Sequence, residues 1–203
     1  MMMGAGTDTT AITMTFTLLM LAMHEEVQDR LYSEIYEIFG DDDNKEPEYS
    51  DFERMPYLEM VMKETLRRWT LAPFLNRTVK EDVKIGPYTL PAGCDISINV
   101  PYIHLNPRYY NEPLKFNPDN FTPEAEAKRP KYAYIPFSSG PRICIGRVLA
   151  ETEIKLTVIA LLRNFRFHSS LTMENLKLEL SALPRSACGY PISIKWRKPK
   201  KHI

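Results

Sequence analysis

The chain has 203 residues, of which 44% are hydrophobic and 26% charged, a composition typical of a folded globular domain and not of a disordered chain. Its 26 basic and 26 acidic residues give a formal net charge of zero, so no overall field would recruit nucleic acid. The cysteines, Cys94, Cys144 and Cys188, are far apart and odd in number, which favours a reducing compartment over a disulfide framework. The basic end KWRKPKKHI is expected to be solvated, with a contact to an anionic membrane or an acidic partner as the alternative.

Three helices are predicted in the first third of the chain. Residues 11–23 are almost entirely apolar and would be buried on every side, but they are too few for a membrane-spanning helix, which needs about 20. Residues 24–39 carry apolar side chains at helical spacing on one face and acidic ones on the other, which indicates an amphipathic helix. After an acidic loop, Pro56 starts a third helix that continues to about Trp69.

The rest of the chain mixes short strands with irregular segments. DVKIGPYTL and CDISINV have a period of two and predict short strands around Gly-Pro and Pro-Ala-Gly turns. Residues 101–141 are interrupted by prolines and rich in aromatic side chains, which indicates a long, ordered, irregular meander. A helix is predicted right after Cys144, to about Asn164, and YPISIKW closes the chain as a strand. The expected fold class is mainly α with small β-sheets, in one domain.

Cys144 stands in the segment FSSGPRICIG, just before a predicted helix. A thiolate at a helix N-terminus is stabilised by the helix dipole and by free backbone N–H groups. Gly140 and Gly146 remove side chains on either side, which suits a flat group against the backbone, and Arg142 can pair with a carboxylate or phosphate. A buried inert thiol and a Cys–His nucleophile are the alternatives. Zinc is disfavoured, because no second cysteine and no suitably spaced histidines accompany Cys144.

Two more local patterns have simple structural interpretations. Glu64 and Arg67, in KETLRR, stand three residues apart on one helical face, where a solvated surface pair is the commonest arrangement. In AGTDTT, Gly6 costs a helix about 1 kcal/mol relative to alanine. Threonine hydroxyls that hydrogen-bond back to carbonyls and bend the helix are the simplest interpretation of the threonines around it.

Taken together, these residues resemble a known family. FSSGPRICIG matches the haem-binding signature Phe-x-x-Gly-x-Arg-x-Cys-x-Gly of the cytochrome P450 monooxygenases at every fixed position, and the similarity extends over essentially the whole chain. The resemblance implies the C-terminal part of the cytochrome P450 fold, with haem b as cofactor and Cys144 as the axial thiolate ligand of its iron. It further implies that Arg142 pairs with a haem propionate and that Phe137 packs beside the ligand sulfur. Arg77, ten residues after Arg67, would be a second propionate partner.

The resemblance also gives roles to the other two patterns. KETLRR looks like the Glu-x-x-Arg of the family, which would make Glu64 and Arg67 a buried structural pair that holds the meander near the haem. In place of the usual third member, an arginine, this chain has Asn120, whose amide can still bridge the pair by hydrogen bonds. AGTDTT resembles the distal helix over the haem, where Asp8 and Thr9 would deliver protons during oxygen activation.

By the same resemblance, the protein is a haem-dependent monooxygenase that inserts one oxygen atom from O₂ into a small apolar substrate. Its electrons would come from NADPH through an NADPH-cytochrome reductase, with cytochrome b5 as a further candidate partner. The chain looks most similar to the microsomal clan that includes the fatty-acid omega-hydroxylases. Ala5, however, stands where many of that group have a glutamate that can esterify the haem, so covalent haem is not expected and the fatty-acid assignment is weaker.

The resemblance also bears on extent and location. A complete family member is considerably longer, so residues 1–203 are expected to be a partial domain, from the distal helix to the C-terminus, without the N-terminal portion and its membrane anchor. The expected location is the cytosolic face of the endoplasmic reticulum membrane, with the mitochondrion as the alternative. Two other hypotheses stay open. One is an oxygen-independent haem-thiolate isomerase, and the other is a truncated, non-catalytic chain that is unstable or only binds partners.

Overall fold

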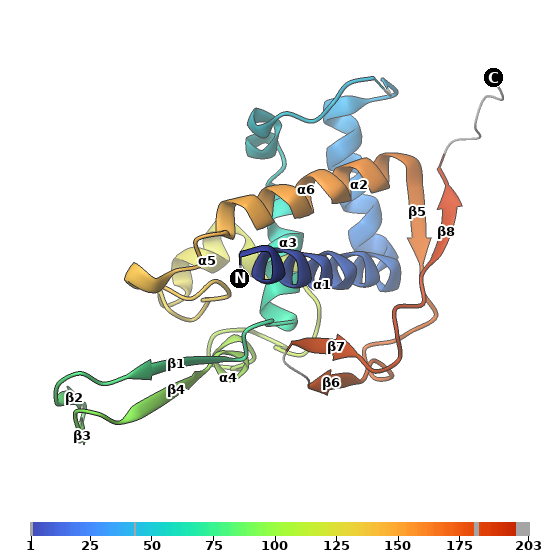
Figure 1. Ribbon diagram of the computed structural model, residues 1–203. Coiled ribbons are helices and arrows are strands. Elements are labelled where there is room, and N and C mark those ends of the chain that lie inside the picture. The colour runs from blue at the N-terminus through green and yellow to red at the C-terminus, as the bar shows by residue number, and fades with distance from the viewer. Residues whose placement is uncertain (1, 43, 181–182, 198–203) are drawn as a thin grey trace.

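The computed structural model describes residues 2–42, 44–180 and 183–197. The basic end beyond residue 197 lies outside the described residues. The described part is mainly helical with small two-stranded antiparallel sheets, which confirms the predicted fold class (Figure 1).

Four helices form the body of the molecule. They are α1 (Met2–Met23), α2 (Glu25–Phe39), α3 (Pro56–Arg68) and α6 (Arg147–Asn164), and the 3₁₀ helix η1 (Tyr49–Arg54) lies between α2 and α3. Helix α1 packs against the other three, and α6 also contacts α2 and α3. The apolar side chains between these helices form one core, which includes Phe16, Leu31, Val61 and Val158.

The local patterns explain where α1 and α2 lie. On α2, the predicted apolar face is buried, including Leu31 and Ile35. In α1, the hydroxyls of Thr9, Thr13, Thr15 and Thr17 each donate a hydrogen bond to the carbonyl four residues earlier, so these side chains satisfy their own polar groups. Most of 12–22 is buried, although Ala11 is exposed, so the prediction of burial on every side is too strong.

Helix α3 begins at Pro56, as predicted, and Trp69 is its C-cap residue. Its first turn is also capped from outside. The carboxylate of Glu34, on α2, accepts hydrogen bonds from the backbone N–H groups of Tyr57 at 2.7 Å and Leu58 at 2.9 Å. These donors have no partner within their own helix, so the contact both caps α3 and ties it to α2.

The strands form ladders outside the helical body. β1 (Phe74–Thr78) pairs with β4 (Asp95–Asn99), and β2 (Val83–Ile85) pairs with β3 (Tyr88–Leu90) at the far end of the same projection (Figure 1). Near the C-terminus, β5 (Phe165–His168) pairs with β8 (Ser193–Trp196), and β6 (Leu178–Leu180) with β7 (Pro184–Ser186). The strands predicted in DVKIGPYTL, CDISINV and YPISIKW are confirmed, whereas β1, β5, β6 and β7 were not predicted.

The segment predicted as an irregular meander contains more helix than expected. Its short helices are α4 (Val100–His104), the 3₁₀ helices η2 (Pro118–Phe121) and η3 (Gly140–Arg142), and α5 (Pro123–Lys128). The side chains of Asn99, Asn117 and Thr122 cap α4, η2 and α5, each ahead of a proline in the first turn. Buried aromatic side chains such as Tyr110 and Phe121 confirm that the segment is ordered. Within the described residues, none of the helices combines the length and apolar content that crossing a bilayer requires.

Candidate functional site

Cys144 lies in a tight loop, residues 135–146, that ends where α6 begins. We call this segment the cysteine loop. The backbone N–H of Cys144 donates a hydrogen bond to the carbonyl of Phe137 at 3.0 Å, which closes the loop, and its thiol is exposed. Gly140 has a φ of +77°, a conformation that suits glycine. Ser138 has a φ of +67° without being glycine, which costs on the order of 1 kcal/mol. The Nη2 of Arg77, on β1, donates a hydrogen bond to the Ser138 hydroxyl at 3.3 Å and so contacts the loop at this position.

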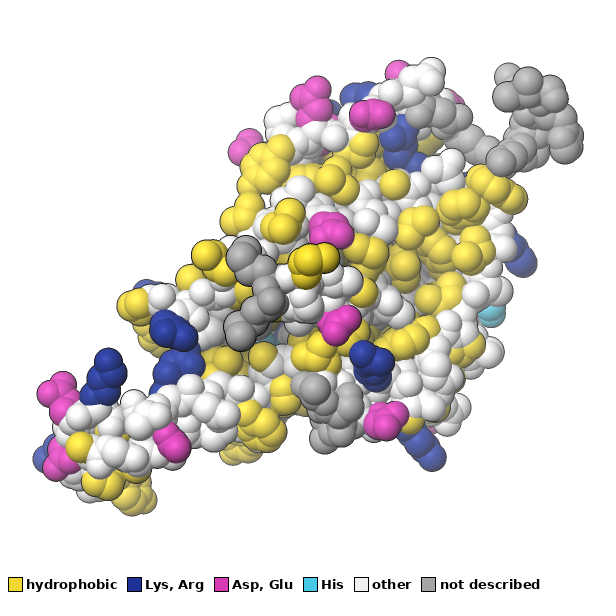
Figure 2. All heavy atoms as spheres, viewed as in Figure 1, with side chains coloured by type: hydrophobic (Ala, Val, Ile, Leu, Met, Phe, Trp, Pro, Cys, Tyr) yellow, Lys and Arg dark blue, Asp and Glu magenta, His cyan; other side chains and the backbone are white. Residues whose placement is uncertain are grey.

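The surroundings of the thiol are open and apolar. Ile145 is 93% exposed, and Val148 and Leu149, in the first turn of α6, are 62% and 69% exposed. A side chain added at Gly140 or Gly146 would meet no other atom within 4 Å. Figure 2 shows that hydrophobic side chains gather broadly on the face on which α1 lies in front. An exposed thiol therefore lies among uncovered apolar side chains.

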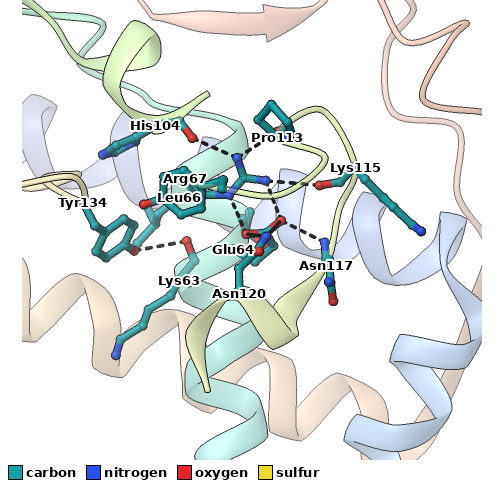
Figure 3. Close-up of polar contacts among 12 residues, drawn as sticks. Lys63, Glu64, Leu66, Arg67, His104, Pro113, Lys115, Asn117, Asn120 and Tyr134 are labelled. Atoms are coloured by element: carbon teal, nitrogen blue, oxygen red, sulfur yellow. Dashed lines mark hydrogen bonds and ion pairs between the residues drawn. The ribbon is translucent and has the colours of Figure 1, made fainter. Parts of the chain in front are cut away.

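A buried ion pair holds α3 to the meander. Arg67 donates from Nε to Oε2 of Glu64 at 2.6 Å and from Nη2 to Oε1 at 2.7 Å, and both side chains are 0% exposed (Figure 3). The arginine also donates to the carbonyls of His104 at 2.9 Å, Pro113 at 2.8 Å and Lys115 at 3.1 Å. All five N–H donors of the guanidinium are thus satisfied, which is the condition for burying such a charge at tolerable cost.

Asn120 takes part in this network as the third member. Its Nδ2 lies 3.3 Å and 3.4 Å from the two carboxylate oxygens of Glu64, and the backbone N–H of Asn117 donates to Oε1 at 2.8 Å. The structure therefore brings Glu64, Arg67 and Asn120 together. The simple interpretation of the pair as solvated does not hold, because the side chains of Glu64 and Arg67 are both buried.

His104 is a buried polar residue for which no role was predicted. It is 0% exposed, and its ring nitrogens lie 2.9 Å from Thr70 Oγ1 and 2.9 Å from the backbone nitrogen of Ile135. Burial, assisted by the charge of Arg67, lowers the pKa of His104 to about 3, so the ring is neutral. The only sequence signal was its position in HLNPRYY, where nothing indicates burial.

The proposed proton donors lie on the open part of α1. Asp8 is exposed, and the hydroxyl of Thr9 donates a hydrogen bond at 2.6 Å to the carbonyl of Ala5 and not to Asp8. This is the back-bonded arrangement that the threonine pattern suggested. A side chain added at Gly6 would meet no other atom within 4 Å, so the backbone there is approachable.

Comparison with known proteins decides the family. The cytochrome P450 family model matches residues 1–190. The chain belongs to the cytochrome P450 family. It is 37% identical over 194 residues to cytochrome P450 4g15 of Drosophila melanogaster, which covers 95% of this chain and 34% of that protein. It is 42% identical over 178 residues to cytochrome P450 4c21 of Blattella germanica, covering 88% and 35%. With human cytochrome P450 4V2 the identity is 38% over 193 residues, covering 95% and 36%.

This cytochrome P450 chain spans about a third of the length of the curated relatives it matches. Haem with a cysteine-ligated iron is the cofactor of the family. The residues around Cys144 fit such a group. The chain offers one exposed thiol, apolar side chains beside it and open space at the two glycines. The side chain of Arg142 is exposed and has no hydrogen bond or ion pair within the described part of the chain, so it is free to meet a carboxylate.

Proposed function

We propose that the protein is a haem-thiolate monooxygenase and that Cys144 is the ligand of its iron. The observation that carries this proposal is the exposed thiol of Cys144, three residues before α6, in a loop that keeps open space and apolar surface around it. A thiolate is a soft ligand that suits iron.

In this proposal, several residues hold the haem. Arg142 and Arg77 pair with the propionates, and Arg77 already contacts the cysteine loop through Ser138. Phe137 packs beside the ligand sulfur, and Gly140 and Gly146 leave room for the flat ring. Glu64, Arg67 and Asn120 have a structural role: they hold the meander against α3.

Haem bound through a thiolate supplies the oxygen chemistry, because the sulfur favours cleavage of the O–O bond. The chain itself supplies protons and positions. Asp8, which is exposed, exchanges protons with solvent, and Thr9 passes them on. Because the hydrogen of the Thr9 hydroxyl is directed to the carbonyl of Ala5, delivery requires the hydroxyl to rotate away from that carbonyl.

We also propose the partners and the setting that family membership favours. The electrons come from NADPH through an NADPH-cytochrome reductase, with cytochrome b5 as a second donor. The substrate is a small apolar molecule that receives one oxygen atom from O₂. The protein acts at the cytosolic face of the endoplasmic reticulum membrane, as a member of the clan that includes the omega-hydroxylases.

The test of the ligand is spectroscopic. The haem-loaded protein is reduced and exposed to carbon monoxide, and a red-shifted, thiolate-type Soret band is expected. Cys144→Ala should abolish this band. Cys188→Ala is the matched control, because Cys188 is also a free, exposed thiol, and it should leave the band in place. A thiolate band that survives Cys144→Ala would overturn the assignment.

A further inference from the structure

His104 joins three separate parts of the chain. Its ring lies between Thr70, just after α3, and Ile135, at the start of the cysteine loop, while His104 itself ends α4. Because the backbone N–H of Ile135 can only donate, Nε2 must be the unprotonated nitrogen that accepts. Nδ1 therefore carries the hydrogen and donates it to the hydroxyl of Thr70 at 2.9 Å. The two bonds define one tautomer of a neutral ring.

The backbone of the same residue links the ring to the buried ion pair. The carbonyl of His104 accepts a hydrogen bond from Arg67 Nη1 at 2.9 Å. Its ring also stacks on Tyr134, with 5.3 Å between ring centroids, and the Tyr134 hydroxyl donates to the carbonyl of Lys63, on α3, at 3.1 Å. Two successive residues are thus attached to this part of the fold: Tyr134 to Lys63 of α3 (Figure 3), and Ile135 to the ring of His104.

From Ile135, backbone hydrogen bonds within the loop lead to the backbone of Cys144. The carbonyl of Ile135 accepts from the backbone N–H of Ser138 at 3.1 Å. Phe137, two residues after Ile135, holds the backbone N–H of Cys144 at 3.0 Å. The hydrogen bond to Ile135 therefore acts on the base of the loop that carries Cys144.

We propose that His104 is a positioning residue for Cys144, acting through its hydrogen bond to the backbone of Ile135. The inference rests on the proposed function, since it takes Cys144 to be the haem ligand. If His104 only filled the core, losing the hydrogen bond at Nδ1 and losing the one at Nε2 should affect the Cys144 loop equally. A positioning residue must keep the Nε2 acceptor in particular.

Two amide substitutions separate these roles. His104→Gln places its side-chain oxygen near the position of Nε2, so it can still accept from Ile135 while it loses the bond to Thr70. His104→Asn reaches only the position of Nδ1, so it keeps Thr70 and loses Ile135. The two variants have the same chemical group and differ in which partner they retain. His104→Phe keeps the stacking on Tyr134 and removes both hydrogen bonds.

The first measurement is the carbon monoxide spectrum of the reduced, haem-loaded full-length protein, scaled to its haem content. We expect His104→Gln to keep most of the thiolate-type band, and His104→Asn and His104→Phe to lose at least half of it to a band without thiolate. Equal spectra for the Gln and Asn variants would overturn the proposal, as would loss that only follows the amount of folded protein.

The second measurement does not depend on haem ligation. Amide hydrogen exchange of residues 135–144 should be at least tenfold faster in His104→Asn than in His104→Gln. If Cys144→Ala left the thiolate band unchanged, the proposed function would fail while the exchange result still decided whether His104 positions the loop. Equal exchange in the two variants would show that it does not.

Discussion

Arg67 and Glu64 form a two-pronged ion pair, with 2.6 Å and 2.7 Å between donor and acceptor atoms, and neither side chain has any exposed surface. The pair lies within one helix, yet the remaining donors of the arginine bind carbonyls 37 to 48 residues further along the chain. Its main structural effect is therefore to attach the meander to α3.

Arg67→Met should be strongly destabilising, because it leaves the Glu64 carboxylate buried without its cation. Breaking a buried pair in this way costs about 3–5 kcal/mol. The measurement is the free energy of unfolding in urea. Glu112→Gln is the control, since it breaks a pair with Lys115 whose side chains are 65% and 64% exposed, and such a pair contributes at most about 1 kcal/mol. Similar losses for the two variants would contradict the role assigned to Arg67.

Asn120→Ala should have a much smaller effect than Arg67→Met. The amide of Asn120 contacts Glu64 at 3.3 Å and 3.4 Å, but Arg67 and the backbone of Asn117 still satisfy the carboxylate without it. We expect a loss of about 1 kcal/mol in the same urea experiment, the usual net value of one hydrogen bond. A loss as large as that of Arg67→Met would mean that Asn120 holds the network together.

The stability of the protein should fall as the pH is lowered from about 6.5 towards 3. The pKa of His104 is lowered from 6.5 to about 3 by burial and by the charge of Arg67, so in this window the unfolded chain binds a proton that the folded protein does not. This group alone would lower the free energy of unfolding by up to about 1.4 kcal/mol per pH unit.

The check is the pH dependence of urea unfolding between pH 7 and 5 in the wild type and in His104→Gln. His104→Gln should show a flatter dependence than the wild type. Parallel curves for the wild type and His104→Gln would rule out His104 as the titrating group.

Thr9→Ala should slow substrate oxidation by about 10²-fold, the lower end of the contribution of a positioned proton donor. The measurements are NADPH and O₂ consumption together with product formation. Thr15→Ala is matched to it, since Thr15 makes the same type of back-bond, to Ala11, without a proposed role in proton delivery. Unchanged oxidation by Thr9→Ala would show that Thr9 does not deliver the protons, and turnover without consumption of NADPH or O₂ would favour the oxygen-independent isomerase over the monooxygenase.

Arg142→Ala should weaken haem binding without lowering the stability of the haem-free protein. The side chain of Arg142 makes no polar contact with the described residues, so its removal should change the unfolding of haem-free protein by at most about 0.5 kcal/mol. Loss of a charged hydrogen bond to a propionate costs about 1.5–3 kcal/mol, and the haem should therefore dissociate roughly 10- to 100-fold faster. If haem dissociated from Arg142→Ala at the same rate as from the wild type, Arg142 would not contact the propionates.

Much of the local structure could be predicted from short patterns. The apolar face of α2, the start of α3 at Pro56 and the helix after Cys144 all depend on residues within one or two turns of each other. The same holds for the cysteine motif, because its glycines, arginine and thiol lie within ten residues. Helical periodicity, proline at a first turn and a compact motif are local properties of the chain, and they can be recognised without knowing how it folds.

Other features depended on residues that only folding brings together. Glu34 caps α3 across 23 residues, and β5 finds its partner β8 near the end of the chain. The sequence by itself determined which residues could ligate and that the longer helices α1, α2, α3 and α6 would form, but not the short helices of the meander. Only the tertiary structure decided that Glu64 and Arg67 are buried and that His104 holds the start of the cysteine loop. The physical reason is that burial and hydrogen-bond partners depend on long-range packing, which spacing along the chain does not encode.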